Sequence, residues 1–245
     1  MTLRLWVDTD LGDNPDDAVA LLAAATHPAV DLVGVSTVRG DVEARAAMVT
    51  ELLQAADRRV PLVYAGPPDP RAIRVAEAVL AIGPCTNLAG LLRSGVELPP
   101  AAVMGGVIAP TVHRGEVRTT ETNFAADPLA AALVVAHASD VLLVPLDATS
   151  TMVIDDDAAG RLAAVAAPLG STIERWQASG HPICLHDPLA LLALVGEHVR
   201  VERHRMGVSV EGRVVLDGID GVEQDLVIDA DAMAATRRVL ELVLG

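Results

Sequence analysis

The sequence predicts an α/β fold with an open, mostly parallel sheet flanked by helices. Short apolar runs alternate with segments of helical periodicity, a pattern typical of repeated βα units. Clusters of polar residues follow most of the apolar runs, at the points where the predicted strands end. In a parallel sheet the carboxyl ends of the strands meet along one edge, where ligands bind. At 245 residues the chain fits one ordinary domain. We therefore expect residues 1–245 to form one unit, with its functional site at the carboxyl edge of the strands.

The first half of the chain contains most of the expected strands. Apolar runs predict strands at 3–8, 30–36, 61–64, 79–83 and 101–105. Helical periodicity predicts helices at 15–26, 42–56 and 87–93. The first of these helices has Asn14 as a candidate N-cap and Pro15 at its first position. The Pro- and Gly-rich stretch 65–70 is too short for a linker and indicates a surface turn.

The second half is predicted to be richer in helix. A helix at 128–138 begins at Pro128, with Asp127 as its N-cap, and a strand follows at 140–145. Further helices are expected at 157–178, 187–197 and 231–244, and residues 208–215 have the pattern of a hairpin.

Composition excludes several classes of function. A formal charge of -15 argues against a nucleic-acid or anionic-membrane partner. All basic residues are arginine, which excludes chemistry that needs a catalytic lysine, including pyridoxal phosphate enzymes and the P-loop. No apolar run approaches the roughly 20 residues of a membrane span, and the N-terminus lacks signal-peptide features. Two cysteines, Cys85 and Cys184, make no disulfide framework, so a cytoplasmic location is expected.

A cluster of acidic residues follows the first predicted strand. Residues 8–17 hold five carboxylates, which repel one another unless a cation compensates. Hard oxygen ligands of this kind favour Ca²⁺ or Mg²⁺ over zinc. An EF-hand loop beginning at Asp8 fails, because Asp13 and Val19 stand where Gly and Glu are needed. A haloacid-dehalogenase-type phosphatase, which would use Mg²⁺, also opens with Asp-x-Asp after a strand, but it normally needs a lysine.

Seven motifs in order resemble those of the inosine-uridine preferring nucleoside hydrolase family. They cover nearly the whole chain and are Asp8-Thr9-Asp10-Leu11-Gly12 with Asp16-Asp17-Ala18, Val63-Tyr64-Ala65-Gly66, Gly83-Pro84-Cys85-Thr86-Asn87-Leu88-Ala89, Met104-Gly105-Gly106, Glu121-Thr122-Asn123-Phe124-Ala125-Ala126-Asp127-Pro128, Val144-Pro145-Leu146-Asp147-Ala148-Thr149 and His186-Asp187-Pro188-Leu189-Ala190. The resemblance implies a calcium-dependent enzyme that hydrolyses the N-glycosidic bond of ribonucleosides to ribose and free base. It further implies a Rossmann-like fold, and we expect a homodimer or homotetramer.

The resemblance also implies roles for individual residues. The calcium ligands would be the carboxylates of Asp10, Asp17 and Asp187 and the backbone carbonyl of Thr86, with Asp8 at the same site. Asp10 matches the general base that takes a proton from the attacking water. The ribose contacts would be Asp16 and Asn123 at the 2′- and 3′-hydroxyls and Glu121 at the 5′-hydroxyl, which serve an oxocarbenium-like transition state.

The leaving base would be assisted by His186, since imidazole suits proton transfer or hydrogen bonding near neutral pH. Trp176 stands where an aromatic side chain contacts the base. There are three simpler alternatives. Trp176 could be half-buried packing, His186 could only support Asp187, and Thr86-Asn87 could be an ordinary helix cap. The remaining histidines lack a motif and are expected at the surface or in turns: His27, His113, His137, His181, His198 and His204.

Four features depart from the family pattern. Leu11 replaces a common proline, and Asp13-Asn14 lengthens the loop that follows. Arg39-Gly40-Asp41 replaces a Gly-Asn pair, which leaves the role of Asp41 open. The segment between Tyr64 and Gly83 is short and lacks a His-Gly-rich stretch of the base pocket. These departures affect the base pocket, so two alternatives stay open beside the hydrolase: the phosphatase, and a non-catalytic protein that binds Ca²⁺ and a riboside.

Overall fold

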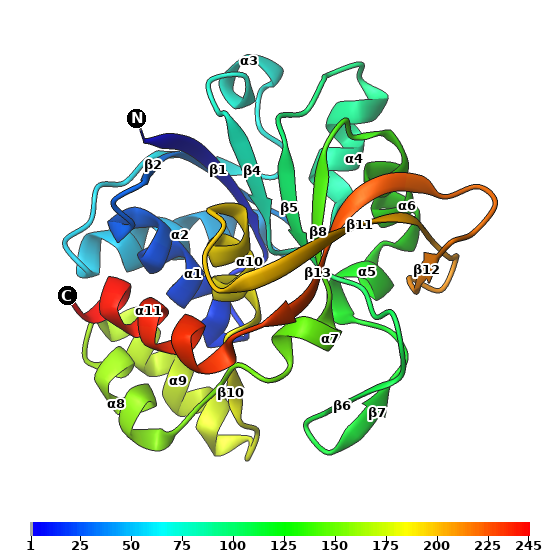
Figure 1. Ribbon diagram of the computed structural model, residues 1–245. Coiled ribbons are helices and arrows are strands. Elements are labelled where there is room, and N and C mark those ends of the chain that lie inside the picture. Colours follow the sequence, from blue (N-terminus) through cyan, green and yellow to red (C-terminus); the bar gives the residue numbers. More distant parts are fainter. Residues whose placement is uncertain (1) are drawn as a thin grey trace.

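A nine-stranded sheet forms the centre of the protein in a computed structural model that describes residues 2–245 (Figure 1). Its strands lie in the order β12-β11-β13-β8-β5-β4-β1-β2-β3. In chain order they are β1 (Leu3–Thr9), β2 (Val30–Thr37), β3 (Leu62–Ala65), β4 (Ala78–Ala81), β5 (Ala101–Met104), β8 (Val141–Val144), β11 (Val199–Val208), β12 (Val214–Leu216) and β13 (Val222–Ala230).

The sheet is parallel apart from β11, which runs antiparallel to both β12 and β13. Strands β2 and β3 follow β1 in the chain and lie on one side of it in the sheet. The next strands, β4, β5 and β8, lie on the other side of β1. This reversal puts a topological switch point between β1 and β4, and ligands of open α/β sheets bind beyond the strand ends at such a point.

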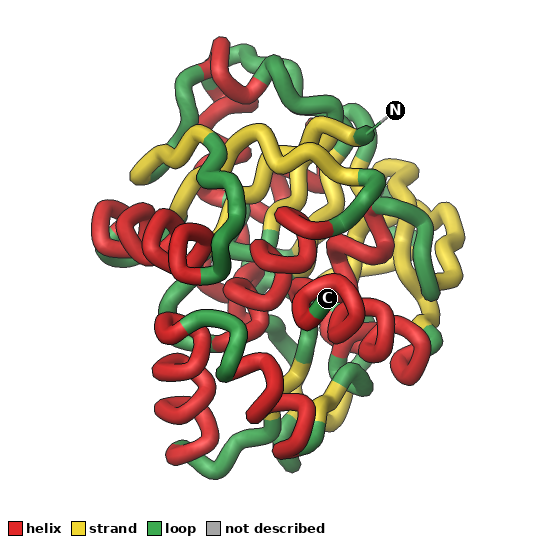
Figure 2. Tube along the Cα trace, turned by 90° about the vertical axis from the view of Figure 1, so that its left-hand side faces the viewer, coloured by secondary structure: helices red, strands yellow, loops and turns green. Residues whose placement is uncertain are grey.

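Helices cover both faces of the sheet, as the sequence predicts. The core cluster on one face includes side chains of α1 (Pro15–Thr26), α2 (Val42–Ala55), α8 (Asp156–Ala163), α9 (Ala167–Ala178), α10 (His186–Leu194) and α11 (Ala232–Leu244). The cluster on the other face includes side chains of α3 (Pro70–Ile73), α4 (Thr86–Arg93), α5 (Thr122–Ala126) and α6 (Pro128–His137). Figure 2 shows the C-terminus at the end of α11, among helices on the side that faces the viewer.

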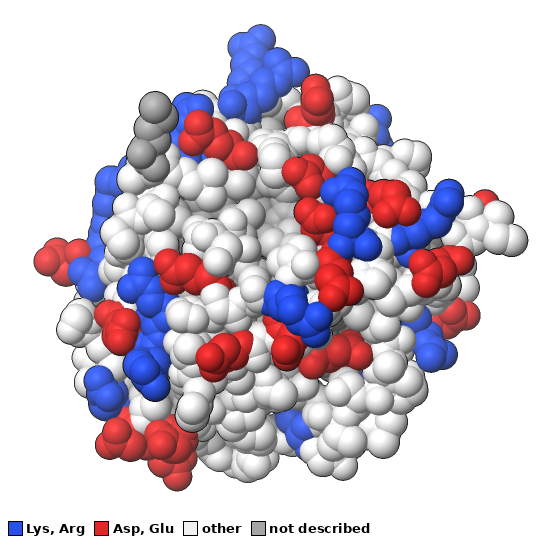
Figure 3. Space-filling view, viewed as in Figure 1, with Lys and Arg blue, Asp and Glu red and all other residues white. Residues whose placement is uncertain are grey.

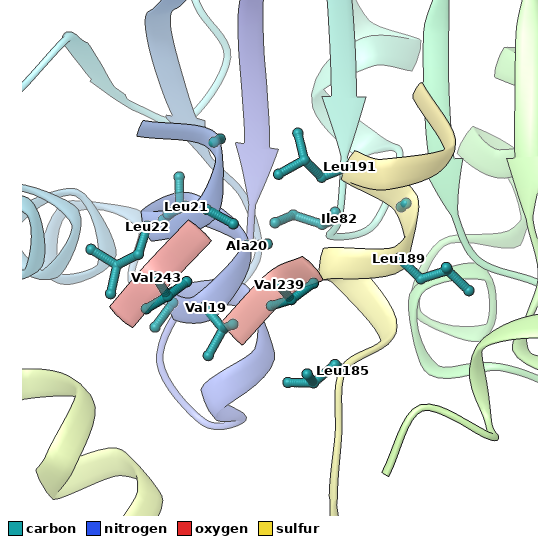
Figure 4. Packing of buried hydrophobic residues seen from close by; sticks show 14 of the residues in the cluster. Val19, Ala20, Leu21, Leu22, Ile82, Leu185, Leu189, Leu191, Val239 and Val243 are labelled. Carbon is teal, nitrogen blue, oxygen red and sulfur yellow. The ribbon is translucent and has the colours of Figure 1, made fainter. Parts of the chain in front are cut away.

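Helix α1 is buried all round, which explains why its sequence has no polar stripe. Val19 to Leu22 lie close to Leu191 of α10 and to Val239 and Val243 of α11 (Figure 4). Each fully buried side chain of this size contributes about 1.5–3 kcal/mol to stability. The packing fixes the first turn of α1, and with it Asp16 and Asp17, against the sheet.

The prediction of one helix at 157–178 is wrong, because the chain forms two helices there. Helix α8 ends at Ala163 and α9 begins at Ala167. Pro168 lies in the first turn of α9, where its ring is tolerated, whereas it would break the interior of a longer helix.

Sequence patterns also missed several strands. The hairpin at 208–215 is present, since Val208 pairs with Val214, but β11 is far longer than predicted and β13 was not expected. Two short ribbons lie outside the main sheet: β6 (Thr111–His113) pairs with β7 (Glu116–Arg118), and β9 (Val153–Ile154) with β10 (Ile183–Cys184). The short helix α7 (Leu146–Thr149) follows β8. Among the described residues, no helix has the length and apolar character needed to cross a membrane.

Candidate active site

A cavity of about 460 Å³ opens at the carboxyl edge of the sheet. Its lining comes from the loop after β1, the first turns of α1 and α10, the β6–β7 hairpin, the start of α5 and the end of α9. The cavity therefore lies where the switch point between β1 and β4 predicts a ligand site.

The end of β1 supplies the first polar groups. Thr9 Oγ1 donates a hydrogen bond to Asp17 Oδ1 and accepts one from the backbone N–H of Leu11, which ties the strand end to α1. Asp10 lines the cavity, and its Oδ2 accepts a hydrogen bond of 3.1 Å from Arg39. The Arg45 guanidinium donates to the backbone carbonyls of Asp10 and Leu11. Gly83 lies so close that a Cβ there would approach the backbone nitrogen of Asp10 to 2.9 Å, so the motif glycine makes room for this loop.

Two helix N-termini bring three more carboxylates together. Asp16 and Asp17 lie in the first turn of α1 and Asp187 in the first turn of α10, where helix dipoles favour negative charge. One carboxylate oxygen from each lies within 4.8 Å of the others, and all three side chains are buried.

Burial and mutual repulsion raise the pKa of each of these acids. Burial raises the pKa of Asp16 to about 7. The pKa values of Asp17 and Asp187 lie well above the ordinary value, first through burial and then through the neighbouring carboxylates. Burial also raises the pKa of Asp10, against the opposing effect of the Arg39 guanidinium. Without a compensating cation, the four groups cannot all be ionised near neutral pH.

The carboxylate group has the chemistry of a site for a hard cation. Among the described residues, Asp16 Oδ1 is buried and has no hydrogen-bond partner. Asp10, Asp16, Asp17 and Asp187 supply only oxygen donors on this side of the cavity, as Ca²⁺ and Mg²⁺ require.

Glu121 and Asn123 also line the cavity, at the start of α5. Glu121 caps this helix, since its carboxylate accepts from the N–H groups of Asn123 and Phe124, and it also accepts from Gly106. Asn123 donates from Nδ2 to the carbonyls of Ile82 and Met104, which leaves its Oδ1 as an acceptor. Both residues line the cavity, and these hydrogen bonds hold each of the two side chains in a fixed orientation there.

Asp8 and Thr86 lie outside the cavity lining. Asp8 is fully buried, and its Oδ1 accepts hydrogen bonds from Ser36 and Asn87. Burial raises the pKa of Asp8 to about 7. Thr86 begins α4, and its hydroxyl donates to Asp127. Their visible contacts are thus structural.

The far end of the cavity is built from the β6–β7 hairpin, α9 and α10. His186 Nδ1 lies 2.8 Å from Thr149 Oγ1, and the His113 ring approaches the His186 ring edge-on at 4.9 Å. Burial lowers the pKa of His186 to about 3 and that of His113 to about 4, so both imidazoles are neutral near pH 7. The Arg114 guanidinium stacks over Trp176 at 4.4 Å.

A sequence model described as the inosine-uridine preferring nucleoside hydrolase matches residues 5–79 and 73–236. The chain belongs to the inosine-uridine preferring nucleoside hydrolase family. The family match does not favour the phosphatase or the non-catalytic binding protein.

Curated and solved relatives agree with this membership. Non-specific ribonucleoside hydrolase RihC of Escherichia fergusonii is 30% identical over 210 residues, which are 66% of this chain and 67% of the relative. RihC of Escherichia coli K12 is 30% identical over 205 residues, which are 64% of this chain and 66% of the relative. A plant nucleoside hydrolase has the same fold, with a TM-score of 0.82 at 16% identity over the full length of both chains. A purine-preferring ribonucleoside hydrolase from Gardnerella vaginalis has a TM-score of 0.80 at 20% identity, over 98% of this chain and 99% of that one.

Sequence reasoning missed several residues of this nucleoside hydrolase cavity. His113, Arg114 and His181 line it, although both histidines were expected at the surface or in turns. His27 is also buried, where it lies 3.3 Å from Glu197. Arg39 contacts Asp10, whereas Asp41 caps α2 through Ala44. The unusual Arg39-Gly40-Asp41 triplet could have indicated that Arg39 lies at the site. Nothing in the sequence indicates that residues 113 and 186 are in contact.

Proposed function

We propose that this chain hydrolyses the N-glycosidic bond of ribonucleosides to ribose and free base in the cavity at the carboxyl edge. The observation that carries the proposal is that Asp10, Asp16 and Asp187 line the same cavity as Glu121 and Asn123. Family membership supports the reaction, and the RihC relatives are named non-specific ribonucleoside hydrolases. The proposed substrate is a small-molecule ribonucleoside, which consists of one ribose and one base.

Ribose binding is assigned to the polar groups on both sides of the cavity. Asp16 keeps one buried oxygen without a protein partner, which suits a hydroxyl of the 2′,3′-diol. The Oδ1 of Asn123 is an acceptor for the same diol, since its Nδ2 is engaged by two carbonyls. Glu121 is assigned to the 5′-hydroxyl. Carboxylates around the ring also stabilise the positive charge of an oxocarbenium-like transition state.

Asp10 is assigned as the general base that takes a proton from water as it attacks the anomeric carbon. Its carboxylate lies at the cavity wall, with Oδ2 oriented by Arg39. Burial raises the pKa of the Asp10 carboxyl from its ordinary value. The Arg39 contact opposes this shift and holds the side chain in place.

His186 is assigned to the leaving base. Its lowered pKa means that the ring is neutral near pH 7, so it assists by a hydrogen bond from Nε2 rather than as a stored imidazolium. Thr149 can donate to Nδ1, which leaves the proton on Nε2. Trp176 is proposed as the apolar surface for the base, with Arg114 on its ring.

We infer that Ca²⁺ is the cation of the carboxylate site. Asp10, Asp17 and Asp187 would hold it, with the backbone carbonyl of Thr86 as a further ligand and Asp8 as a buried support. Hard oxygen donors in this number fit calcium. When bound, the ion offsets the repulsion between the carboxylates and acidifies a water molecule.

The remaining assignments concern the state of the protein. We propose that residues 1–245 act as one unit, because both core clusters share the same sheet. A net charge of -15 supports a small-molecule partner rather than nucleic acid or membrane. On the face in Figure 3, basic and acidic side chains are interspersed. We further propose that the protein forms a homodimer or homotetramer in the cytoplasm.

A nucleoside panel tests the function. Purine and pyrimidine ribonucleosides are incubated with the protein, with and without a chelator, and reducing sugar and free base are measured. We expect ribose release that the chelator abolishes and added Ca²⁺ restores. A nucleoside 5′-monophosphate serves as the control for phosphatase activity, and release of phosphate without release of base would refute the assignment.

A further inference from the structure

Three donor side chains from separate elements meet at the base end of the cavity. His113 ends β6, Cys184 ends β10 and His186 begins α10. One donor atom from each lies within 4.8 Å of the others. Cys184 and His186 are 2% and 5% exposed, so solvent reaches this group mainly through His113 and the cavity.

The two imidazoles are arranged for a shared ligand. Thr149 engages Nδ1 of His186, so Nε2 is the nitrogen left for another partner. Histidines that bind metals commonly fix their second nitrogen by such a hydrogen bond. The His113 ring stands edge-on to His186 at 4.9 Å. Tetrahedral zinc needs nitrogen and sulfur ligands about 3.4–3.7 Å apart, so a closure of about 1 Å completes the site.

The protonation states also suit a metal. Burial raises the pKa of the Cys184 thiol, while the neighbouring Arg114 guanidinium offsets part of that rise. A metal would displace the thiol proton to solvent. Arg114 favours the resulting thiolate and can remain stacked on Trp176.

We propose that His113, Cys184 and His186 form a second metal site, for a thiophilic divalent ion such as Zn²⁺. Nitrogen and sulfur donors prefer such ions, whereas the oxygen donors of Asp10, Asp17 and Asp187 prefer hard cations. The two groups of donors therefore select different metals within one cavity. Three protein ligands leave a fourth position open to water or a ligand.

Occupation of this site has a consequence for catalysis, which rests on the proposed function. His186 Nε2 cannot bind a metal and donate a hydrogen bond to a leaving base at the same time. Zn²⁺ should therefore inhibit hydrolysis of nucleosides even when Ca²⁺ is saturating.

Cobalt binding tests the site without any turnover. Co²⁺ is titrated into the reduced protein at saturating Ca²⁺, and the near-ultraviolet thiolate-to-cobalt charge-transfer band is recorded. Wild type should give one band that saturates at one Co²⁺ per chain and is bleached by Zn²⁺. Cys184→Ser should lose the band, and His113→Gln should weaken Co²⁺ binding at least tenfold. Cys85→Ala, which removes the other buried thiol, should keep both band and affinity.

The outcomes separate this site from the proposed reaction. A wild-type protein without the band, or a band that survives Cys184→Ser, overturns the metal site whatever the activity. A band that disappears in Cys85→Ala assigns the sulfur ligand elsewhere and also overturns it. Ribose release from nucleosides is measured separately, and its absence would refute the hydrolase assignment while the cobalt result stands.

Discussion

The two ends of the cavity are built differently. The carboxylate end lies on β1 and on the first turns of α1 and α10, all fixed by the main sheet and its core. The base end lies on the β6–β7 hairpin and the segment from α9 to β10, outside the main sheet. A hairpin can change without disturbing the sheet. We infer from this difference that residues held by the sheet carry out the proposed reaction, whereas the hairpin and the α9–β10 segment determine base preference.

Removal of the proposed base should have the largest effect. Asp10→Asn keeps an oxygen at the same place but cannot take a proton, so kcat for ribonucleosides should fall on the order of 10²–10⁴. Steady-state kinetics measure this loss. The control is Asp13→Asn, since that side chain is 92% exposed and should leave kcat nearly unchanged. Near-normal turnover in Asp10→Asn would move the base role to another residue.

His186→Ala should affect one class of substrate. Nucleosides need assistance to the leaving base, so the rate of their hydrolysis should fall on the order of 10²–10⁴. In p-nitrophenyl riboside the p-nitrophenolate leaves well without a proton, so the rate of hydrolysis of this substrate should change little. Kinetics on both substrates measure the ratio, with the exposed His137→Ala as a control. Equal losses on both would mean that His186 only supports Asp187, and the division between the two ends would fail.

The same division decides how far the sequence predicts the site. The motifs around Asp10, Asp16 and Asp187 follow strand ends or begin helices, and a parallel sheet brings such positions to one edge. The parallel strands and most helices were predictable for the same reason. His113 and Arg114 were not, because a two-stranded ribbon fixes no position relative to the sheet. Strands β11 and β13 were also missed, since their charged residues obscure the apolar pattern.

Metal removal should destabilise the protein through the carboxylate end. A ligand at a hundredfold excess over its Kd contributes about 2.7 kcal/mol, which for a chain of this size corresponds to about 5–10 °C in Tm. Thermal unfolding with Ca²⁺ and with chelator measures the shift. Asp187→Asn should remove most of it, whereas Asp13→Asn should preserve it. A Tm that is the same with and without Ca²⁺ would contradict the cation site.

Calcium affinity should rise with pH. The pKa of Asp16 is about 7, above its ordinary value, and those of Asp17 and Asp187 are also raised, so protons occupy the metal-free site below neutrality. For each carboxyl that must lose a proton, the affinity rises about tenfold per pH unit as long as the pH is below the pKa of that carboxyl. Above that pKa the carboxyl is already ionised and adds no further gain. Calorimetric titrations from about pH 6 to pH 8 should show affinity that rises with pH. A flat profile would mean that the carboxylates are ionised without the metal.

Reconstitution of the chelated protein tests the central claim most directly. Ca²⁺ is titrated into metal-free protein at a concentration far above Kd, and initial rates of ribose release from inosine and uridine are measured at each addition. We predict a rate that rises linearly and stops rising at one Ca²⁺ per chain, with one free base released for each ribose. Ribose release that persists without any divalent cation, or no release at one Ca²⁺ per chain, would contradict it.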